Sequence, residues 1–282
     1  MVKIVTNAVC DLTAEKAAEY GIELVPEIIS FGSVSYLTNV DITPPELYKK
    51  MRQFKDLPTG SQPNVAMYMD AFESARGVCD EIVCLNMTSR MSGSFNTANL
   101  AKLLLEEEGF PAEIHVIDTL QLSHGLGFLA IEAAKLARTG KCAAEIVENI
   151  ENLKSLIGEY FVLKSLVNAK KGGRIGAIRM AVADVFGVKP VLMFRDGTVS
   201  DVGLTYSDRQ ALSALVSWYE KRAERGRNVV VFHADNPADA EFVKAGINKL
   251  DPKAAVELCW LGAGIGIYTG DGAVGITFWE SV

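Results

Sequence analysis

Short apolar segments alternate with helical patterns along the first half of the chain, and this alternation restricts the possible folds more than any other feature. "VKIVT" (residues 2–6), "EIVCLNM" (81–87) and "EIHVID" (113–118) have the length and composition of buried strands. Residues 96–108 and 126–140 follow the helical period instead. Strands that alternate with helices predict a parallel sheet covered by helices on both faces.

The second half of the chain has a different pattern. "GVKPVLMFRDGTVSDVGLTY" (187–206) predicts a hairpin with its turn at Arg195-Asp196-Gly197, and the chain closes with further strand-like segments. A length of 282 residues is enough for two domains of ordinary size. We therefore predict an α/β protein of two domains. Residues 1–155 form an N-terminal parallel-sheet α/β sandwich, and residues 156–282 form a smaller C-terminal mixed-sheet α/β domain.

Composition argues against several classes of function. The net charge of −7 argues against a nucleic-acid partner. No apolar run approaches the roughly 20 residues of a membrane helix, and the start of the chain lacks a signal-peptide pattern. The cysteines are scattered without a C-x-x-C pair, which predicts small core residues rather than disulfides or a zinc site, in a reducing cytoplasm. They are Cys10, Cys79, Cys84, Cys142 and Cys259.

The segment "TSRMSGS" (88–94) joins a predicted strand to a predicted helix with more hydroxyl groups than a tight turn needs. The first turn of a helix has free backbone N–H groups and the positive end of the helix dipole. The hydroxyls of Thr88, Ser89, Ser92 and Ser94 add further donors. The segment therefore either binds one carboxylate or phosphate group or is an ordinary polar helix cap.

A second polar turn, "TGSQP" (59–63), precedes another predicted helix. By itself it predicts a helix cap and little more. Its interest is that two polar turns at the ends of adjacent strands could converge on one ligand.

Glycine-rich segments of the second half do not form a nucleotide motif. "GDGAVG" (270–275) has the spacing G-x-G-x-x-G, but a strand-like segment follows it where a dinucleotide site requires a helix. "GAGIG" (262–266) predicts a loop that lets the backbone approach a ligand or a neighbouring strand. "KKGGRIG" (170–176) either binds an anion or is a helix end followed by a turn.

No catalytic motif is present in the sequence. The three histidines, His115, His124 and His233, lie in separate strand or loop contexts, and the known nucleophile and metal motifs are missing. We therefore expect no catalytic residue, no metal ligand and no cofactor.

Taken in order, the motifs of this chain resemble those of the DegV family of bacterial fatty-acid-binding proteins. The resemblance spans nearly the whole chain and implies a two-domain α/β protein that binds one long-chain fatty acid. It places the carboxylate at the domain interface and the tail in an apolar tunnel, mostly within the second domain. It also implies presentation of the acid to a separate ATP-dependent fatty acid kinase, without stable insertion into a membrane. The matching segments are "VTNAVCDL", "GSQP", "MSGS", "VIDTLQLSHGLGFLA", "KKGGRIG", "VKPVL", "HADNP" and "YTGDG".

The resemblance also implies the ligand-binding residues. Ser92 is the expected carboxylate ligand, and Gly93 and Ser94 supply further donors. The remaining expected ligand-binding residues are Gly60, Ser61, Thr59, Tyr268 and Arg174. The tunnel residues are chosen only as apolar residues near the second-domain motifs, and they are Phe161, Leu163, Leu166, Ile178, Phe186, Met193 and Ile265.

Three departures from the family pattern concern the head group. Gly60 replaces the usual threonine ligand, so one hydroxyl is missing unless Thr59 or Ser61 compensates. Tyr268 replaces a histidine, and "NA" at residues 7–8 replaces Asp-Ser in the first turn. Two alternatives stay open, and the substitutions at Gly60 and Tyr268 favour the first of them. One is a divergent family member that binds another amphiphile, such as a retinoid or sterol, or acts mainly through protein contacts. The other is an enzyme that acts on a small anion at the same loop.

Overall fold

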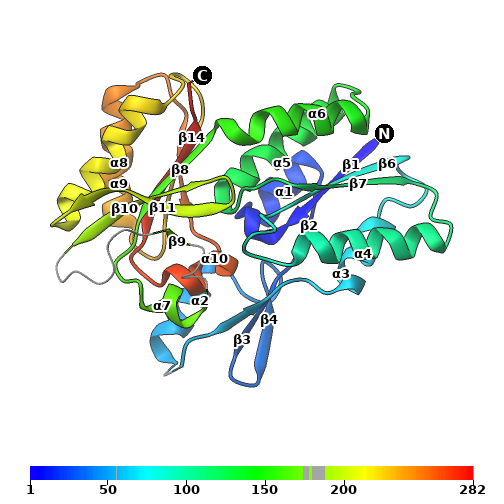
Figure 1. Cartoon of the computed structure of the whole chain (residues 1–282), viewed down its shortest axis with the longest axis horizontal. Coiled ribbons are helices and arrows are strands. Elements are labelled where there is room, and N and C mark those ends of the chain that lie inside the picture. The colour runs from blue at the N-terminus through cyan, green and yellow to red at the C-terminus, as the bar shows by residue number, and fades with distance from the viewer. Residues whose placement is uncertain (55, 174–177, 180–187, 282) are drawn as a thin grey trace. The chain divides into compact units, whose positions relative to one another are not determined.

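The computed structural model describes residues 1–54, 56–173, 178–179 and 188–281, of which 178–179 are described by their backbone alone. The chain divides into two compact units (Figure 1). Unit 1 comprises Met1–Thr43 and Pro58–Ser155, and unit 2 comprises Pro44–Leu57 and Leu156–Val282.

Unit 1 contains the predicted parallel sheet. Its strand order is β2-β1-β6-β7, and every neighbouring pair is parallel. Asn7, Asn86 and Asp118 end three of these strands, so their side chains gather at the carboxyl edge of the sheet, where ligands of open α/β sheets bind. The strands are β1 (Val2–Asn7), β2 (Ile22–Val25), β6 (Glu81–Asn86) and β7 (Glu113–Asp118).

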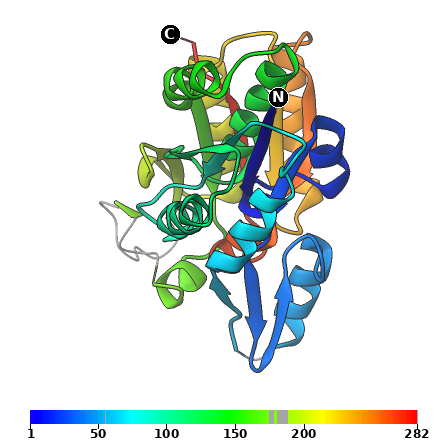
Figure 2. The ribbon, with the colours of Figure 1, turned by 90° about the vertical axis from the view of Figure 1, so that its right-hand side faces the viewer.

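Helices cover both faces of this sheet, as predicted (Figures 1 and 2). Side chains of α3 and α4, such as Phe72 and Ala101, pack on Ile82 and Cys84 on one face, and α5 and α6 cover the other. The helices of unit 1 are α1 (Ala14–Tyr20), α3 (Val65–Glu73), α4 (Ser94–Glu107), α5 (Ser123–Arg138) and α6 (Ala143–Leu153), with short 3-10 turns η1 (Ala8–Cys10) and η2 (Lys154–Leu156).

A second, antiparallel sheet of unit 1 has the order β4-β3-β5. It consists of the hairpin β3 (Ile28–Phe31) and β4 (Val34–Leu37) and of β5 (Thr59–Ser61). The chain passes through unit 2 between β4 and β5, so this sheet joins segments that are separated by residues 44–57.

Unit 2 is built on a mixed sheet in the order β13-β12-β14-β8-β10-β11-β9. The β10–β11 hairpin turns where the sequence predicts, with Asp196 and Gly197 both at positive φ, as such tight turns require. The strands are β8 (Ile157–Val162), β9 (Ile178–Arg179), β10 (Lys189–Arg195), β11 (Thr198–Thr205), β12 (Val229–His233), β13 (Val256–Trp260) and β14 (Val274–Trp279).

The core of unit 2 lies between one face of this sheet and the helices α8 (Asp208–Arg222) and α9 (Pro237–Leu250). The Tyr160 ring stacks on Phe278 at 5.5 Å between centroids, and the Tyr219 ring meets Phe278 edge-on at 5.3 Å. The remaining helices of unit 2 are α2 (Pro44–Gln53), α7 (Val167–Lys171) and α10 (Ala263–Thr269).

Residues 44–57 depart from the predicted division of the chain. We placed them in the first domain, but α2 packs in unit 2, where the Tyr48 hydroxyl donates to the Leu261 carbonyl at 2.9 Å. The Tyr48 ring stacks on Trp260 at 6.0 Å. With this segment included, the C-terminal unit is as long as the N-terminal one rather than smaller.

Two local predictions are also wrong. "GAGIG" is the start of helix α10 and not a loop, and Gly266 closely approaches the Tyr48 side chain of helix α2 rather than a ligand or a neighbouring strand. Cys142 is exposed at the start of α6 rather than in a core. Cys10 and Cys84 are buried, and burial raises the pKa of the Cys84 thiol to about 12. Among the described residues, no helix is both long enough and apolar enough to cross a membrane.

Candidate functional site

The loop "TSRMSGS" folds into a compact turn between β6 and α4. The N–H groups of Met91 and Ser92 donate to the Thr88 carbonyl at 3.2 and 3.3 Å. The Ser92 and Ser94 hydroxyls lie 2.8 Å apart, and the Ser94 N–H donates to the Ser92 hydroxyl at 3.2 Å. The loop therefore holds the Ser92 side chain over the first turn of α4.

Several donors of this loop are available to a ligand. Within the part of the chain that the structure describes, the N–H groups of Gly93, Phe95 and Asn96 have no hydrogen-bond partner. These groups lie at the positive end of α4, and the Ser92 side chain beside them is half-buried. Such a group of donors fits one carboxylate or phosphate. Among the described residues, the partners of the Ser92 hydroxyl are groups of Ser94 and no imidazole.

Two of the four predicted hydroxyl donors are not accessible. Thr88 and Ser94 are fully buried, and the Thr88 hydroxyl accepts from the Arg90 N–H at 3.3 Å. The Thr88 N–H donates to Gln121 at 2.9 Å, which fastens the loop to the segment after β7. The Ser89 N–H is also engaged, by the Asp118 carboxylate at 3.2 Å.

The second polar turn meets the first. The Gln62 amide donates to the Thr97 hydroxyl at 2.7 Å, and a Cβ on Gly93 would lie only 2.5 Å from Gln62 Oε1. A larger residue at position 93 would therefore displace the end of the exposed Gln62 side chain. The two turns converge as we expected, but β5 belongs to the antiparallel sheet and is not a neighbour of β6.

The register of β5 shows whether the hydroxyls of Thr59 and Ser61 can replace the one that is missing at Gly60. Gly60 pairs with the buried Ile29, whereas Thr59 pairs with Ser30 and Ser61 with Ile28. Successive side chains of a strand point to opposite faces, so Thr59 and Ser61 point away from the face of Gly60. Neither side chain can supply a hydroxyl on that face.

A buried polar network that the sequence analysis missed lies beneath the loop. Asn7 donates to the Tyr68 hydroxyl, which donates to the Asn86 side chain at 2.6 Å. The Met87 N–H donates to Asn7 at 3.0 Å. Burial raises the pKa of Tyr68 well above its usual value, so the phenol keeps its proton. The sequence does carry a signal, because β1 and β6 both end in asparagine, but Tyr68 sits in an apolar helix and resembles an ordinary core residue.

A buried carboxyl group also lies at this edge of unit 1. Glu27 is 7% exposed, and its carboxyl oxygen Oε2 accepts from the Thr38 hydroxyl at 3.1 Å. Burial raises the pKa of Glu27 to about 8, because the ionised form loses its hydration. The side chain is therefore mostly protonated at neutral pH and adds little negative charge near the loop.

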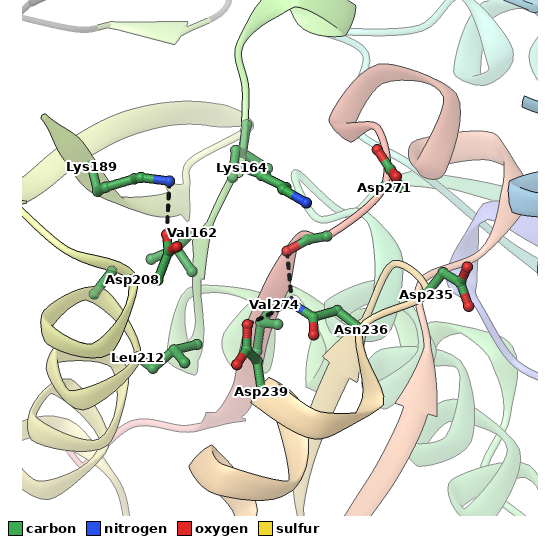
Figure 3. A pocket seen from close by; sticks show the side chains of 13 residues that line it. Val162, Lys164, Lys189, Asp208, Leu212, Asp235, Asn236, Asp239, Asp271 and Val274 are labelled. Carbon is green, nitrogen blue, oxygen red and sulfur yellow. Dashed lines mark hydrogen bonds and ion pairs between the residues drawn. The ribbon is translucent and has the colours of Figure 1, made fainter. Parts of the chain in front are cut away.

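Unit 2 contains a pocket of about 250 Å³ at the first turns of α8 and α9 (Figure 3). Its rim is charged: Lys189 pairs with Asp208 at 2.7 Å, and Asn236 donates to Asp239 at 2.7 Å. Lys164 also extends into it. The floor is apolar and consists of Val162, Leu163, Ala211, Leu212 and Val274.

Those predicted tunnel residues whose side chains are described lie on more than one face of unit 2. Leu163 lines the pocket. Met193 pairs with Tyr160 and packs into the core under α8 and α9, whereas Phe161 alternates with Tyr160 and points to the opposite face of the sheet.

The other predicted residues of unit 2 lie around α7 and α10. Leu166 precedes α7 and Ile265 lies within α10, and both are half-buried. The Tyr268 ring packs against Gly172, where an added Cβ would lie 2.5 Å from the ring. The side chain of Ile178, and Arg174 and Phe186 altogether, lie outside the described residues.

One group of potential metal ligands lies elsewhere in unit 1. Glu81, Glu113 and His115 place a ligand atom each within 4.8 Å of one another. His115 Nε2 lies 3.1 Å from Glu113, and Glu81 accepts from the Ala143 N–H at 3.1 Å. This group could not be predicted from the sequence, because Glu81 lies in β6 and the other two residues lie in β7, and only the pairing of the strands brings them together.

Comparisons with known proteins give a consistent result. The model of the family described as "Uncharacterised protein, DegV family" matches residues 1–281. A DegV domain-containing protein of Clostridium acetobutylicum is 30% identical over 99% of this chain and 97% of its own length.

The fold is similar to that of solved structures. The crystal structure of DegV, a fatty acid binding protein from Bacillus subtilis, has a TM-score of 0.89 at 22% identity and covers 99% of both chains. The B3 protein of Streptococcus pneumoniae fatty acid kinase, loaded with linoleic acid, has a TM-score of 0.84 at 21% identity and covers 100% of both chains. At these identities the likeness concerns the fold.

Proposed function

The chain belongs to the DegV family, and from this premise we propose that it binds a single long-chain fatty acid. The Ser92 hydroxyl and the N–H groups that follow it from Gly93 bind the carboxylate, while the buried Ser94 holds the Ser92 side chain. Unit 2 receives the acyl chain. The observation that carries the proposal is a set of backbone donors over the first turn of α4, beside the Ser92 hydroxyl, that have no partner among the described residues. The Bacillus subtilis and Streptococcus pneumoniae proteins, which share this fold, bind fatty acids.

The tail and the head group contribute differently to binding. Burial of about 15 methylenes is worth on the order of 12 kcal/mol before the costs of association. A contact with the end of a helix dipole is worth only about 0.3–2 kcal/mol. The tail therefore sets the affinity, and the loop sets the orientation of the carboxylate. The missing hydroxyl at Gly60 is compatible with tight binding for this reason.

Unit 2 must provide more space than its described pocket for a long acyl chain. The pocket holds about 250 Å³, whereas sites for small molecules usually hold about 300–1,000 Å³. Its apolar floor continues into the core beneath α8 and α9. We therefore include in the proposal that the acyl chain enters this core and changes its packing.

The proposal includes delivery of the acid to an ATP-dependent fatty acid kinase in the cytoplasm. It rests on the similarity to the B3 protein of the Streptococcus pneumoniae kinase. Delivery depends on the position of the carboxylate more than binding does, because a misplaced carboxylate can be held tightly and still not react. Gly60 and Tyr268 therefore bear on this step more than on lipid binding. In this role the chain itself performs no chemistry.

Native mass spectrometry of the purified protein, followed by denaturing extraction, tests the proposal. We expect one bound acid of about 14 to 18 carbons, a length that supplies the methylenes counted above. A protein that purifies without lipid, and that binds no fatty acid after delipidation, contradicts it. Extraction of a sterol or retinoid would point to the other amphiphile, and turnover of a small phosphate ester that is lost in Ser92→Ala would point to an enzyme.

A further inference from the structure

Both ends of the loop of residues 88–94, here called the head-group loop, lie against the buried side chain of Tyr68. At the entry, the Tyr68 hydroxyl donates to the side chain of Asn86, the last residue of β6. At the exit, the side chain of Ser94, the first residue of α4, lies beside the same hydroxyl and acts to lower its pKa against the larger effect of burial. The Ser94 hydroxyl in turn lies 2.8 Å from that of Ser92. Tyr68 is thus one contact away from the proposed carboxylate ligand.

The network has a fixed direction and no net charge. Asn7 accepts from the Met87 N–H at 3.0 Å and donates to the Tyr68 hydroxyl, which uses its own proton for Asn86. Asn7, Tyr68, Asn86 and Ser94 are all fully buried. Buried polar groups with satisfied hydrogen bonds allow one arrangement, because any other leaves a donor or acceptor unpaired.

We propose that Tyr68 is a positioning residue of the head-group loop, which holds the Ser92 hydroxyl and the free N–H groups in the arrangement that selects an ionised carboxylate over an uncharged head group. This inference rests on the proposed function. Without the phenol hydroxyl, Asn86 and Ser94 lose their common partner, and the two ends of the loop can move independently. The tail still binds, since it supplies most of the affinity. The selectivity for the acid is lost, because hydrogen bonds to a charged group depend on accurate placement.

The test compares two ligands that share a tail. The Kd values of palmitate and of hexadecanol are measured with delipidated wild type, Tyr68→Phe and the control Tyr20→Phe. Tyr20 is a suitable control because it is the last residue of α1, in the same unit but outside the network. Its ring packs under the guanidinium of Arg138. We expect Tyr68→Phe to raise the Kd of palmitate about tenfold and to change that of hexadecanol less than about twofold. Tyr20→Phe should change neither.

A double-mutant cycle makes the test independent of general damage to the fold. If Tyr68 acts partly through Ser94, the losses of palmitate affinity in Tyr68→Phe and Ser94→Ala should be less than additive in the double variant. Additive losses contradict the inference, as does a parallel rise in both Kd values or an unchanged palmitate Kd in Tyr68→Phe. A wild type that fails to bind palmitate refutes the proposed function itself. If wild type binds palmitate and Tyr68→Phe still distinguishes palmitate from hexadecanol as well as wild type does, only the role of Tyr68 is refuted.

Discussion

The buried carboxyl of Glu27 should make unit 1 less stable as the pH rises. In the unfolded chain this group has its ordinary pKa of 4.5, whereas burial raises the pKa in the folded protein to about 8. Between these values the folded state binds one proton more than the unfolded state. The stabilisation is therefore complete below pH 4.5 and is lost progressively as the pH rises through about 8.

The size of the effect follows from the two pKa values. One pKa unit corresponds to about 1.4 kcal/mol, so a rise from 4.5 to about 8 corresponds to at most about 5 kcal/mol. This is an upper limit, because an ionised Glu27 can admit water or shift toward the surface. Glu27→Gln removes the titration and keeps the shape. The free energy of unfolding of the variant minus that of wild type should therefore increase by several kcal/mol between about pH 5 and about pH 8.

The assay must report on unit 1. All three tryptophans, Trp218, Trp260 and Trp279, belong to unit 2, so their fluorescence is unsuitable. Urea-dependent hydrogen exchange of the β6 peptide, compared between variants at the same pH, gives the required free energy. Glu23→Gln is the matched control, because Glu23 is partly exposed and pairs with Lys3 at 3.1 Å, so its replacement should change stability by about 1 kcal/mol or less. Parallel pH profiles of wild type and Glu27→Gln would refute the reasoning.

Three further perturbations have definite expected outcomes. Ser92→Ala should weaken palmitate binding about tenfold or more in equilibrium titrations without abolishing it, because one charged hydrogen bond is worth about 1.5–3 kcal/mol; complete loss would show that the head group dominates. Gly266→Ala places a Cβ 3.0 Å from the Tyr48 ring and should break its bond to Leu261, which lowers the stability of unit 2 by about 1–3 kcal/mol in urea unfolding followed by tryptophan fluorescence. Glu280→Gln removes the ion pairs with Arg195 and Arg222 and should lower the stability of unit 2 by about 3 kcal/mol in the same assay. These partners hold the pKa of Glu280 below its ordinary value of 4.5. The difference in stability from wild type should therefore shrink as the pH falls below 4.5.

Local pattern was sufficient to predict the parallel sheet, its helices and the turn at Asp196-Gly197, because period and turn chemistry depend on neighbours in the sequence. It could not assign α2 to a unit. The apolar face of that helix, with Leu47 and Tyr48, shows that it packs on something, but its partners around Leu261 lie more than 200 residues away. The wrong prediction of a loop at "GAGIG" has the same cause. Gly266 lies against Tyr48, which is distant in the sequence, and the local pattern does not show this contact.

The candidate site divides in a similar way. The hydroxyl-rich loop was predicted from the sequence, because strand ends and helix starts define where donors gather. The two polar turns do meet, but not at the ends of adjacent strands, because β5 belongs to the antiparallel sheet. The support beneath the loop was not predicted, because Tyr68 shares an apolar helix with Phe72 and only the fold brings it to Asn7 and Asn86. The tunnel residues were chosen by composition alone, and the alternation of β8 separates Phe161 from Met193.

The most direct test of the account is carbon-13 NMR of carboxyl-labelled palmitate bound to wild type and to Ser92→Ala. The account predicts a single bound carboxyl resonance, distinct from free palmitate, that shifts in the variant while the lipid stays bound. The absence of a bound resonance would contradict fatty acid binding. A bound resonance that is identical in Ser92→Ala would place the carboxylate somewhere other than the loop before α4.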